Sequence, residues 1–356
     1  MRAAVITEPG GPEVFQIQDI DNTTPGPEEV LVEVKATALN RADLLQRRGR
    51  YPSPPGIRQD IPGLEMAGIV TDVGERVFDI SPGTRVFAIL SGEGYSSKLA
   101  IHHRLVAPIP DNLSYIEAAA VPEVFIAAYD ALFNHCGLTT GESVLIHAAG
   151  SGVGTAAIQL ARNIGAKTFG TASTDDKLSK AHQLGLNVGV NYKEKDFAEV
   201  IKEETSGNGV NVILDVVGAS HWDQNISSLA VTGRMVIIGT LGGFKSEANI
   251  STLMFKRLTV RGSVIRTRPA EEKMFLTQQL AKNIVPMFET ERLKPVVDKV
   301  FPLEEVSEAH IYMETNANFG KIILTMETTS KTLIEPSKLP SPKYMHDPSS
   351  IRFSSS

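Results

Sequence analysis

The residue pattern with the clearest chemical content lies between Val144 and Ala161. The apolar run Val144 to Ile146 leads through a small-residue turn into a segment that predicts a helix. A strand that turns tightly into a helix leaves the free N–H groups of the first helical turn facing outward, where they can bind a pyrophosphate. The pattern therefore predicts a dinucleotide site, formed by the turn residues Ser151, Gly152, Val153 and Gly154.

The turn departs from the strict Gly-x-Gly-x-x-Gly fingerprint of such sites. The three fingerprint positions read Ala149, Ser151 and Gly154. Only the last keeps its glycine, the one that lets helix and strand pack closely. A glycine-rich turn without a ligand is the alternative interpretation of this segment.

The residues after the second predicted strand indicate which dinucleotide would bind. A site for NAD carries Asp or Glu about 20 residues beyond the turn, where the carboxylate binds the ribose 2′-hydroxyl. Here the predicted strand 168–171 is followed by Ser173 and Lys177, whose hydroxyl and ammonium groups can bind a 2′-phosphate. These residues favour NADPH. Taken alone, Lys177 is equally well interpreted as an exposed residue in the first turn of a helix.

The elements around this turn predict an α/β chain with two domains. Short β-branched runs broken by Gly and Pro fill residues 1–120, which predicts a β-rich domain. Over residues 121–265, strand patterns alternate with helical ones, which predicts a doubly wound parallel sheet covered by helices. Residues 266–326 contain two late strand patterns, the second at Lys321–Leu324, that we expect to pair back with the first domain.

Composition and charge exclude several classes of protein. The 356 residues are 42% hydrophobic, which is typical of a globular protein, and a net charge of −6 without a long Lys/Arg run argues against binding to nucleic acid or a membrane surface. Cys136 is the only cysteine, so neither an intrachain disulfide nor a zinc site of several thiolates can form. With no long apolar stretch, we expect a cytoplasmic protein. Residues 327–356, dense in Ser, Thr, Pro and Lys, are predicted to be a disordered tail.

Several further segments resemble one known family. Ala38–Gln46, Gly49–Pro52, Pro62–Gly68 and His147–Gln159 resemble the quinone oxidoreductases of the medium-chain dehydrogenase/reductase superfamily. The resemblance implies a GroES-like substrate domain over the first 120 residues, followed by a Rossmann domain that binds NADPH. It also implies electron transfer from NADPH to a quinone or a similar conjugated carbonyl compound.

The zinc ligands of the related alcohol dehydrogenases are missing from this chain. Those enzymes have Gly-His-Glu where this chain reads Gly63-Leu64-Glu65, and leucine cannot bind zinc. His102 and His103 have no thiolate beside them. Without a Lewis acid to stabilise an alkoxide, plain ketones and alcohols are poor substrates, whereas a quinone or an enone spreads the incoming charge by conjugation. We therefore expect a zinc-free reductase of conjugated carbonyls.

The resemblance also implies which residues form the reaction site. Tyr51 is expected to contact the acceptor, and Asn40 to hold the cofactor amide or the acceptor oxygen. A loop tyrosine stiffened by prolines and an N-cap asparagine are the alternatives. Around the cofactor we expect Ser151 near the phosphates, Tyr192 with Ser173 and Lys177 at the 2′-phosphate, Lys321 from the returning strand, and Gly239, Leu241, Val264, Ile265 and Arg266 at strand ends.

The sequence also predicts one protein partner, a second copy of the chain, and it leaves two alternative functions open. The strand over 258–263 is predicted at a sheet edge that a second copy of the chain would cover, which gives a homodimer. An enoyl-thioester reductase is the first rival, because that related branch places a Tyr near a similar Asn-x-x-Asp stretch and also uses NADPH without zinc. The second rival is an NADPH-binding protein without important catalysis, acting as a structural or RNA-binding protein.

Overall fold

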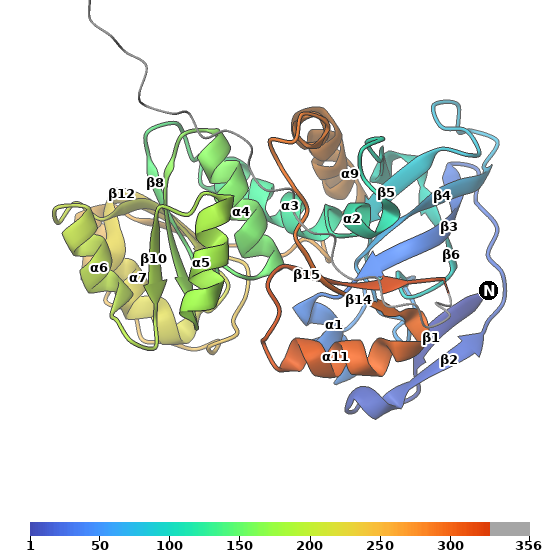
Figure 1. Ribbon diagram of the computed structural model, residues 1–356, viewed down its shortest axis with the longest axis horizontal. Helices are drawn as coiled ribbons and strands as arrows, with labels where there is room; N and C mark the ends of the chain where they lie inside the picture. The colour runs from blue at the N-terminus through green and yellow to red at the C-terminus, as the bar shows by residue number, and fades with distance from the viewer. Residues whose placement is uncertain (328–356) are drawn as a thin grey trace, which may run out of the picture.

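Two sheets of different character form the framework of the chain (Figure 1). The computed structural model describes residues 1–327, so the predicted tail, apart from Glu327, lies outside the described residues. One sheet is parallel and built from residues 143–262, whereas the other is mainly antiparallel and takes strands from both ends of the described chain. This is the predicted combination of a doubly wound α/β domain and a β-rich domain. The domain bounds at 120 and 265 stay a prediction.

The parallel sheet has six strands in the order β10-β9-β8-β11-β12-β13. The chain starts at the centre with β8, extends the sheet on one side and then builds the other side from β11, which is the strand order of a Rossmann fold. β13 lies at an edge, as the sequence predicts. The strands are β8 (Ser143–Ile146), β9 (Lys167–Ala172), β10 (Val188–Asn191), β11 (Val210–Asp215), β12 (Leu229–Ile237) and β13 (Thr259–Gly262).

Apolar side chains alternate between the two faces of this sheet. Ile146 and Leu214 belong to a core cluster shared with α4 and α5, whereas Leu145 and Ile213 pack in a second cluster with α6 and α7. Helices thus cover both faces, which explains the apolar runs of the central strands and confirms the predicted alternation. These helices are α4 (Gly152–Asn163), α5 (Asp175–Leu184), α6 (Phe197–Glu204) and α7 (Trp222–Ser228).

The second sheet has seven strands, with the order β14-β15-β3-β4-β5-β7 and with β6 also paired to β3. The hairpin of β1 (Arg2–Ile6) and β2 (Phe15–Asp19) lies beside it. The seven strands are β3 (Glu29–Ala38), β4 (Glu65–Val73), β5 (Arg85–Ile89), β6 (Lys98–His102), β7 (Val106–Pro108), β14 (Val297–Pro302) and β15 (Lys321–Thr325).

The late strands β14 and β15 return to this sheet, which confirms their predicted pairing. β15 runs antiparallel to β3, with Ile323 opposite Ala38. This register places Lys321, the first residue of β15, beside the end of β3, where the chain continues into Leu39 and Asn40. Residues from opposite ends of the described chain therefore meet at one point.

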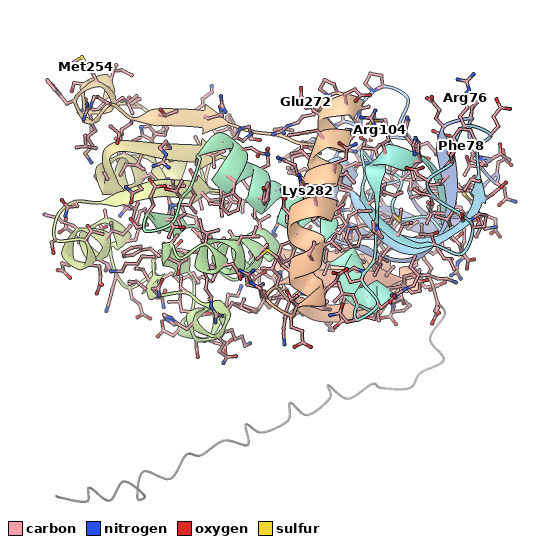
Figure 2. All side chains as sticks on the ribbon, turned by 90° about the horizontal axis from the view of Figure 1, so that it is seen from above. Arg76, Phe78, Arg104, Met254, Glu272 and Lys282 are labelled. Atoms are coloured by element: carbon pink, nitrogen blue, oxygen red, sulfur yellow. The ribbon has the colours of Figure 1, made fainter. Side chains whose placement is uncertain are left out.

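Helices α2 (Tyr115–Ala119), α3 (Pro122–Tyr129) and α9 (Ala270–Gln279) lie between the two sheets (Figure 1). Pro122 separates α2 from α3, because it has no N–H to continue α2 and instead begins α3. Figure 2 shows α9 and its continuation, labelled at Glu272 and Lys282, standing between the two halves of the molecule. The other helices are α1 (Arg41–Arg47), α8 (Ile250–Lys256), α10 (Val285–Glu289) and α11 (Val306–Glu314).

One apolar core continues through the junction. Phe125 and Ile126 of α3 belong to a cluster that contains Ala67 of the antiparallel sheet and Val144 of the parallel sheet. The junction is therefore packed rather than a simple linker. None of the helices within residues 1–327 is both long and apolar enough to cross a membrane.

The returning strand gives a direct test of this architecture. Ile323 is fully buried on β15, so Ile323→Ala should lower the free energy of unfolding by about 2–5 kcal/mol, because the lost methylenes leave a cavity. Ile311→Ala on α11, where the side chain is 53% exposed, is the control and should change stability by less than about 0.5 kcal/mol. Urea unfolding followed by circular dichroism measures both. Equal effects of the two substitutions would contradict the assigned packing.

Candidate active site

The glycine-rich turn connects β8 to α4 as predicted. Ser151 is the N-cap of α4, and its hydroxyl accepts the N–H of Gly154 at 3.0 Å. The helix begins at Gly152, so its free N–H groups lie at the carboxyl edge of the parallel sheet. An anion at this position would meet the positive end of α4.

Two of the glycines are required by close contacts. A Cβ on Gly154 would lie 2.3 Å from the carbonyl oxygen of Ala148, and one on Gly152 would lie 2.7 Å from Cδ of Lys321. The first contact fixes how α4 packs on the turn, and the second lets the stem of Lys321 reach the start of the helix. Glycine at 152 leaves the start of α4 without a side chain of its own, which fits the close approach of a dinucleotide phosphate to the turn.

Except for Lys321, which begins β15, the predicted cofactor residues follow carboxyl ends of parallel strands. Besides the turn after β8, they lie after β9, β10, β12 and β13, along one edge of the sheet. The structure thus brings them to a common edge, while their roles stay predictions. These residues are Ser173 after β9, Lys177 in the first turn of α5, Tyr192 after β10, Gly239 and Leu241 after β12, and Val264, Ile265 and Arg266 after β13.

Lys177 lies over the turn and contacts the far domain. Its stem approaches Gly150, and its Nζ donates to the carbonyl oxygen of Asn316 at 2.5 Å. The guanidinium of Arg41 donates to the side chain of the same Asn316, so two cations meet there. Burial, together with the charge of Arg41, lowers the pKa of Lys177. Sequence reasoning missed Arg41, because no local motif relates it to α5.

Two carboxylates also lie in the first turn of α5, and both have partners. Asp175 accepts from Nδ2 of Asn191 at 3.2 Å, and Asp176 pairs with Lys180 at 2.8 Å. Tyr192 is 44% exposed and packs edge-on against His221, with 5.9 Å between ring centroids. The Tyr192 ring is therefore accessible, and its backbone N–H donates to the carbonyl oxygen of Ala172, the residue before Ser173, at 3.2 Å.

A buried ion pair lies where the two domains meet. Nζ of Lys321 is 2.7 Å from Oε1 of Glu65, and the two side chains are 4% and 0% exposed. Asn40 completes the triangle: its Nδ2 donates to the same Glu65 oxygen at 2.9 Å, and its Oδ1 accepts from Lys321 at 2.8 Å. The third ammonium proton goes to the carbonyl oxygen of Leu39. Lys321 therefore reaches the glycine-rich turn with its methylene stem, while its charge is held by Glu65.

Asn40 is also the N-cap of α1, as its alternative interpretation predicts, while its contact with the cofactor amide or the acceptor oxygen stays a prediction. Asp43 accepts the N–H of Asn40 at 2.7 Å, and the hydroxyl of Tyr95 donates to Asp43 at 3.1 Å. Burial raises the pKa of Asp43 to about 6. The sequence offered a signal for this group, because an acidic residue three positions after an N-cap is typical of a capping box.

Tyr51 is held by Arg266. The guanidinium carbon lies 4.9 Å from the centroid of the Tyr51 ring, and Nη1 donates to the Tyr51 carbonyl oxygen at 3.2 Å. Arg266 is 4% exposed and also donates to Gln46, Ser53 and the carbonyl oxygen of Ser91. Burial raises the pKa of the Tyr51 hydroxyl. Two predicted site residues are thus in contact, with Arg266 positioning the Tyr51 loop.

His147 anchors a polar network under the turn that sequence reasoning missed. Nδ2 of Asn225 donates to Asp215 at 3.3 Å, so Asn225 Oδ1 accepts from His147 Nε2 at 2.7 Å, and His147 Nδ1 accepts from Thr171 at 2.9 Å. Asp215 in turn accepts the N–H of Val217 at 2.7 Å. The network ties the carboxyl ends of β8, β9 and β11 together.

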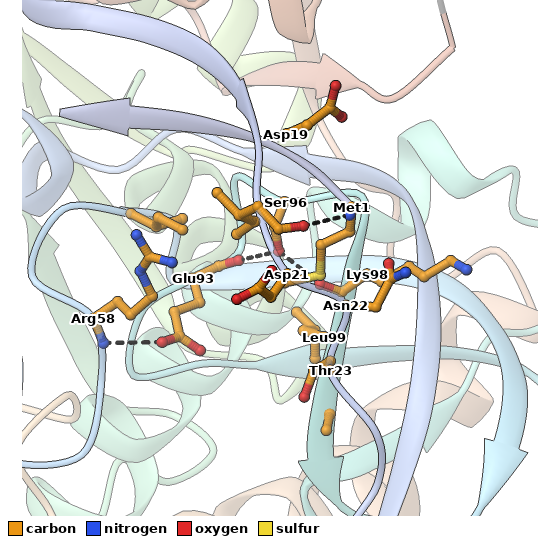
Figure 3. A pocket seen from close by; sticks show the side chains of 13 residues that line it. Met1, Asp19, Asp21, Asn22, Thr23, Arg58, Glu93, Ser96, Lys98 and Leu99 are labelled. Atoms are coloured by element: carbon orange, nitrogen blue, oxygen red, sulfur yellow. Dashed lines mark hydrogen bonds between the residues drawn. The ribbon is translucent and has the colours of Figure 1, made fainter. Parts of the chain in front are cut away.

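A pocket of about 530 Å³ lies away from these residues (Figure 3). Its lining includes Met1, Asp21, Arg58 and Glu93, and none of the predicted site residues. Within residues 1–327 no group of three or more His, Cys, Asp or Glu side chains could hold a metal ion. Leu64 is apolar and 2% exposed, so the residues at this place do not fit zinc.

Comparison with known proteins identifies the class. The family model "Alcohol dehydrogenase GroES-like domain" matches residues 26–128, and "Zinc-binding dehydrogenase" matches residues 152–281. The quinone oxidoreductase of Lama guanicoe is 33% identical over 92% of this chain and 98% of its own length, and that of Homo sapiens is 32% identical with the same coverage. The fold is therefore that of a medium-chain dehydrogenase/reductase with a GroES-like and a Rossmann domain. The chain belongs to the quinone oxidoreductase family of that superfamily.

Solved structures agree with this assignment. A quinone oxidoreductase of Pseudomonas syringae is 30% identical, with a TM-score of 0.80 over 91% of this chain and 99% of that one. The CurK enoyl reductase is 29% identical, with a TM-score of 0.82 over 92% and 99%. A mycobacterial protein solved in complex with NADPH is 27% identical, with a TM-score of 0.81 over 91% and 100%.

The His147 network predicts a specific pH dependence. Burial lowers the pKa of His147 from its ordinary 6.5 to about 3, so the folded protein favours neutral His147 and loses that stabilisation as the pH falls from 6.5 towards 3. His147→Gln removes this titration while keeping a donor and an acceptor. Between pH 6.5 and 4.5 the unfolding free energy of the variant should fall by about 2 kcal/mol less than that of wild type. Urea unfolding at several pH values measures this, and parallel curves would contradict it.

Proposed function

We propose that the chain transfers a hydride from NADPH to quinones and to similar conjugated carbonyls without zinc. The observation that carries the proposal is the match of 92% of the chain to named quinone oxidoreductases, combined with Ser173 after β9 and Lys177 in the first turn of α5. A neutral hydroxyl and an ammonium group there suit a 2′-phosphate. This supports NADPH over NADH.

The residues of the carboxyl edge would hold the cofactor. Backbone N–H groups after Ser151 would bind the pyrophosphate, and Lys177 and Tyr192 would contact the 2′-phosphate end. When bound, NADPH supplies the hydride. Tyr51 and Asn40 would orient the acceptor and the cofactor amide, Asn40 being fixed in orientation by Glu65 and Lys321.

A cytoplasmic location fits this proposal. NADPH-dependent reduction needs no oxidising compartment, and the only thiol, Cys136, is buried. Burial also raises the pKa of Cys136 to about 11, so this thiol is poorly reactive.

Steady-state oxidation of NADPH and of NADH by chelator-treated protein, with 1,2-naphthoquinone as acceptor, tests the proposal. Wild type should turn over with a clear NADPH preference. Lys177→Ala should raise KM for NADPH roughly 10-fold or more and leave KM for NADH nearly unchanged, since a charge-assisted contact to the phosphate is lost. Lys202→Ala, an exposed lysine on α6, is the control and should behave as wild type. Absence of turnover despite cofactor binding would refute the proposal.

An enoyl-thioester reductase is the second candidate. The solved JamJ enoyl reductase is 28% identical, with a TM-score of 0.82 over 92% of this chain and all of that one, which is as similar in fold as the quinone oxidoreductase structure. The two candidates share hydride transfer to a conjugated system and differ in the acceptor. Faster turnover of a crotonyl thioester than of small quinones would favour the second candidate.

We also propose that β13 pairs with its copy in a homodimer. Its outer edge has no strand partner within the described chain, and the preceding α8 exposes Ile250, Met254 and Phe255 at 66%, 63% and 77%. Figure 2 places Met254 at the opposite end of the molecule from Arg76 and Phe78. A second copy would cover both the open edge and this apolar surface.

Light scattering after gel filtration tests the dimer. Wild type should elute with the mass of two chains, and Phe255→Glu should shift it towards the monomer, because a carboxylate would have to be buried in the interface. Phe78→Glu is the matched control, since Phe78 is 88% exposed at the other end and should leave the dimer intact. A wild-type monomer at micromolar concentration would contradict the proposal.

A further inference from the structure

Glu123 is an acidic residue at the domain junction that sequence reasoning did not single out. It lies in the first turn of α3, and its backbone N–H donates to Oε2 of Glu65 at 2.9 Å. Glu65 in turn binds Lys321 and Asn40, so the backbone of Glu123 is connected to both residues through Glu65. Its side chain is half-buried, and its charge, when Glu123 is ionised, raises the pKa of the Tyr51 hydroxyl.

The cations around Glu123 all have other partners. Lys321 donates to Glu65, Asn40 and Leu39, and Arg266 donates to four acceptors around the Tyr51 loop. Lys273 of α9 donates to Ser91 and to the carbonyl oxygen of Arg266. Within residues 1–327 the carboxyl group of Glu123 makes no hydrogen bond and no ion pair.

This environment favours the protonated acid. Burial, and next the charge of Glu65, raise the pKa of Glu123 to about 8; Asp43 acts in the same direction, while Lys321 and Arg266 oppose it. The N-terminus of α3 would favour a carboxylate, but the N–H of Glu123 already binds Glu65. At neutral pH Glu123 therefore keeps its proton.

The reaction proposed above requires a proton. A quinone that accepts a hydride gains two electrons and one hydrogen, and it becomes a neutral hydroquinone only when a proton also binds to oxygen. An enone needs the same proton on the carbon or oxygen of the enolate. The reductant is NADPH, so the chain has to supply only the proton.

We propose that Glu123 is the acid that delivers this proton: its O–H bond breaks, a new O–H bond forms on the reduced acceptor, and the resulting carboxylate is reprotonated from solvent. The inference rests on the proposed function. It assigns to α3 a catalytic residue that belongs to neither the glycine-rich turn nor the Tyr51 loop.

The neighbouring groups are poorer donors. Both oxygens of Glu65 accept hydrogen bonds, and Asp43 has both oxygens engaged behind Asn40. Burial raises the pKa of the Tyr51 hydroxyl, which makes it a weaker acid. Tyr51 is therefore suited to orient the acceptor while Glu123 supplies the proton.

Glu123→Gln tests the inference, because glutamine keeps the size of the side chain and cannot donate an acidic proton. At pH 7 kcat should fall about 100-fold, while the Kd for NADPH changes less than about 2-fold. The loss should be greater with an enone than with a quinone, since an enolate is more basic than a hydroquinone anion. Glu123→Asp should recover part of kcat. Glu203→Gln, at an exposed glutamate on α6, is the control and should match wild type.

The pH profile and infrared spectra separate an acid from a structural residue. In wild type kcat should stay level below about pH 8 and fall above it as Glu123 ionises, and this limb should vanish in Glu123→Gln. Infrared spectra at pH 7 should show a protonated-carboxyl band that Glu123→Gln loses and Glu203→Gln keeps.

The outcomes distinguish this inference from the proposed function. Quinone turnover with an unchanged kcat and pH profile in Glu123→Gln overturns the role of Glu123 and leaves the function standing. A wild type that binds NADPH but reduces neither quinones nor enones overturns both.

Discussion

The buried pair of Lys321 and Glu65 is the interaction on which the site depends. It joins β15 to β4, fixes the amide of Asn40 at the start of α1, and brings Glu65 to the first turn of α3. Removing one partner from such a pair typically costs 3–5 kcal/mol, because the other charge stays buried without compensation. Glu65 and Asn40 therefore have their charged partner only when β15 is paired with the first domain.

The same pair also sets the electrostatics of its surroundings. Because Glu65 uses the ammonium of Lys321, that cation does not pair with Glu123 in the described part of the chain, and the charge of Glu65 helps burial to raise the pKa of Glu123 to about 8. Two carboxyl groups in different environments can thus have different tasks. Arg266 likewise uses its donors for other acceptors. It lies after β13, the edge strand of the parallel sheet, and binds the Tyr51 loop of the other domain.

Local patterns in the sequence predicted much of the fold. The alternation of strand and helix patterns after residue 121 predicted the doubly wound parallel sheet, and the pattern at Lys321–Leu324 predicted a late strand that returns to the first domain. The strand order and the pairing with β3 come from the structure. The helix boundary at Pro122 and the start of β12 at Leu229 were not predicted. Proline at a helix start is a known signal, whereas Gly233 interrupts the apolar run of β12.

The site was predictable only where its residues belong to motifs. Strand ends located the turn, Ser173 and Lys177, whereas Glu123, Arg41 and the His147 network depend on contacts between elements far apart in the sequence. No local pattern states that a glutamate in α3 lacks a partner. That property comes from the hydrogen bonds made by Lys321, Arg266 and Lys273 on other elements.

The segment that leads into β15 runs directly against the glycine-rich turn. The N–H of Gly320 donates to the carbonyl oxygen of Gly150 at 2.8 Å, Ser151 and Gly320 form an isolated β-bridge, and Asn316 holds Lys177. Backbone of the GroES-like domain is thus bonded to the glycine-rich turn of the Rossmann domain. The two domains cannot separate at this point without breaking those bonds, and the hydrogen bonds from Arg266 to the Tyr51 loop connect them a second time.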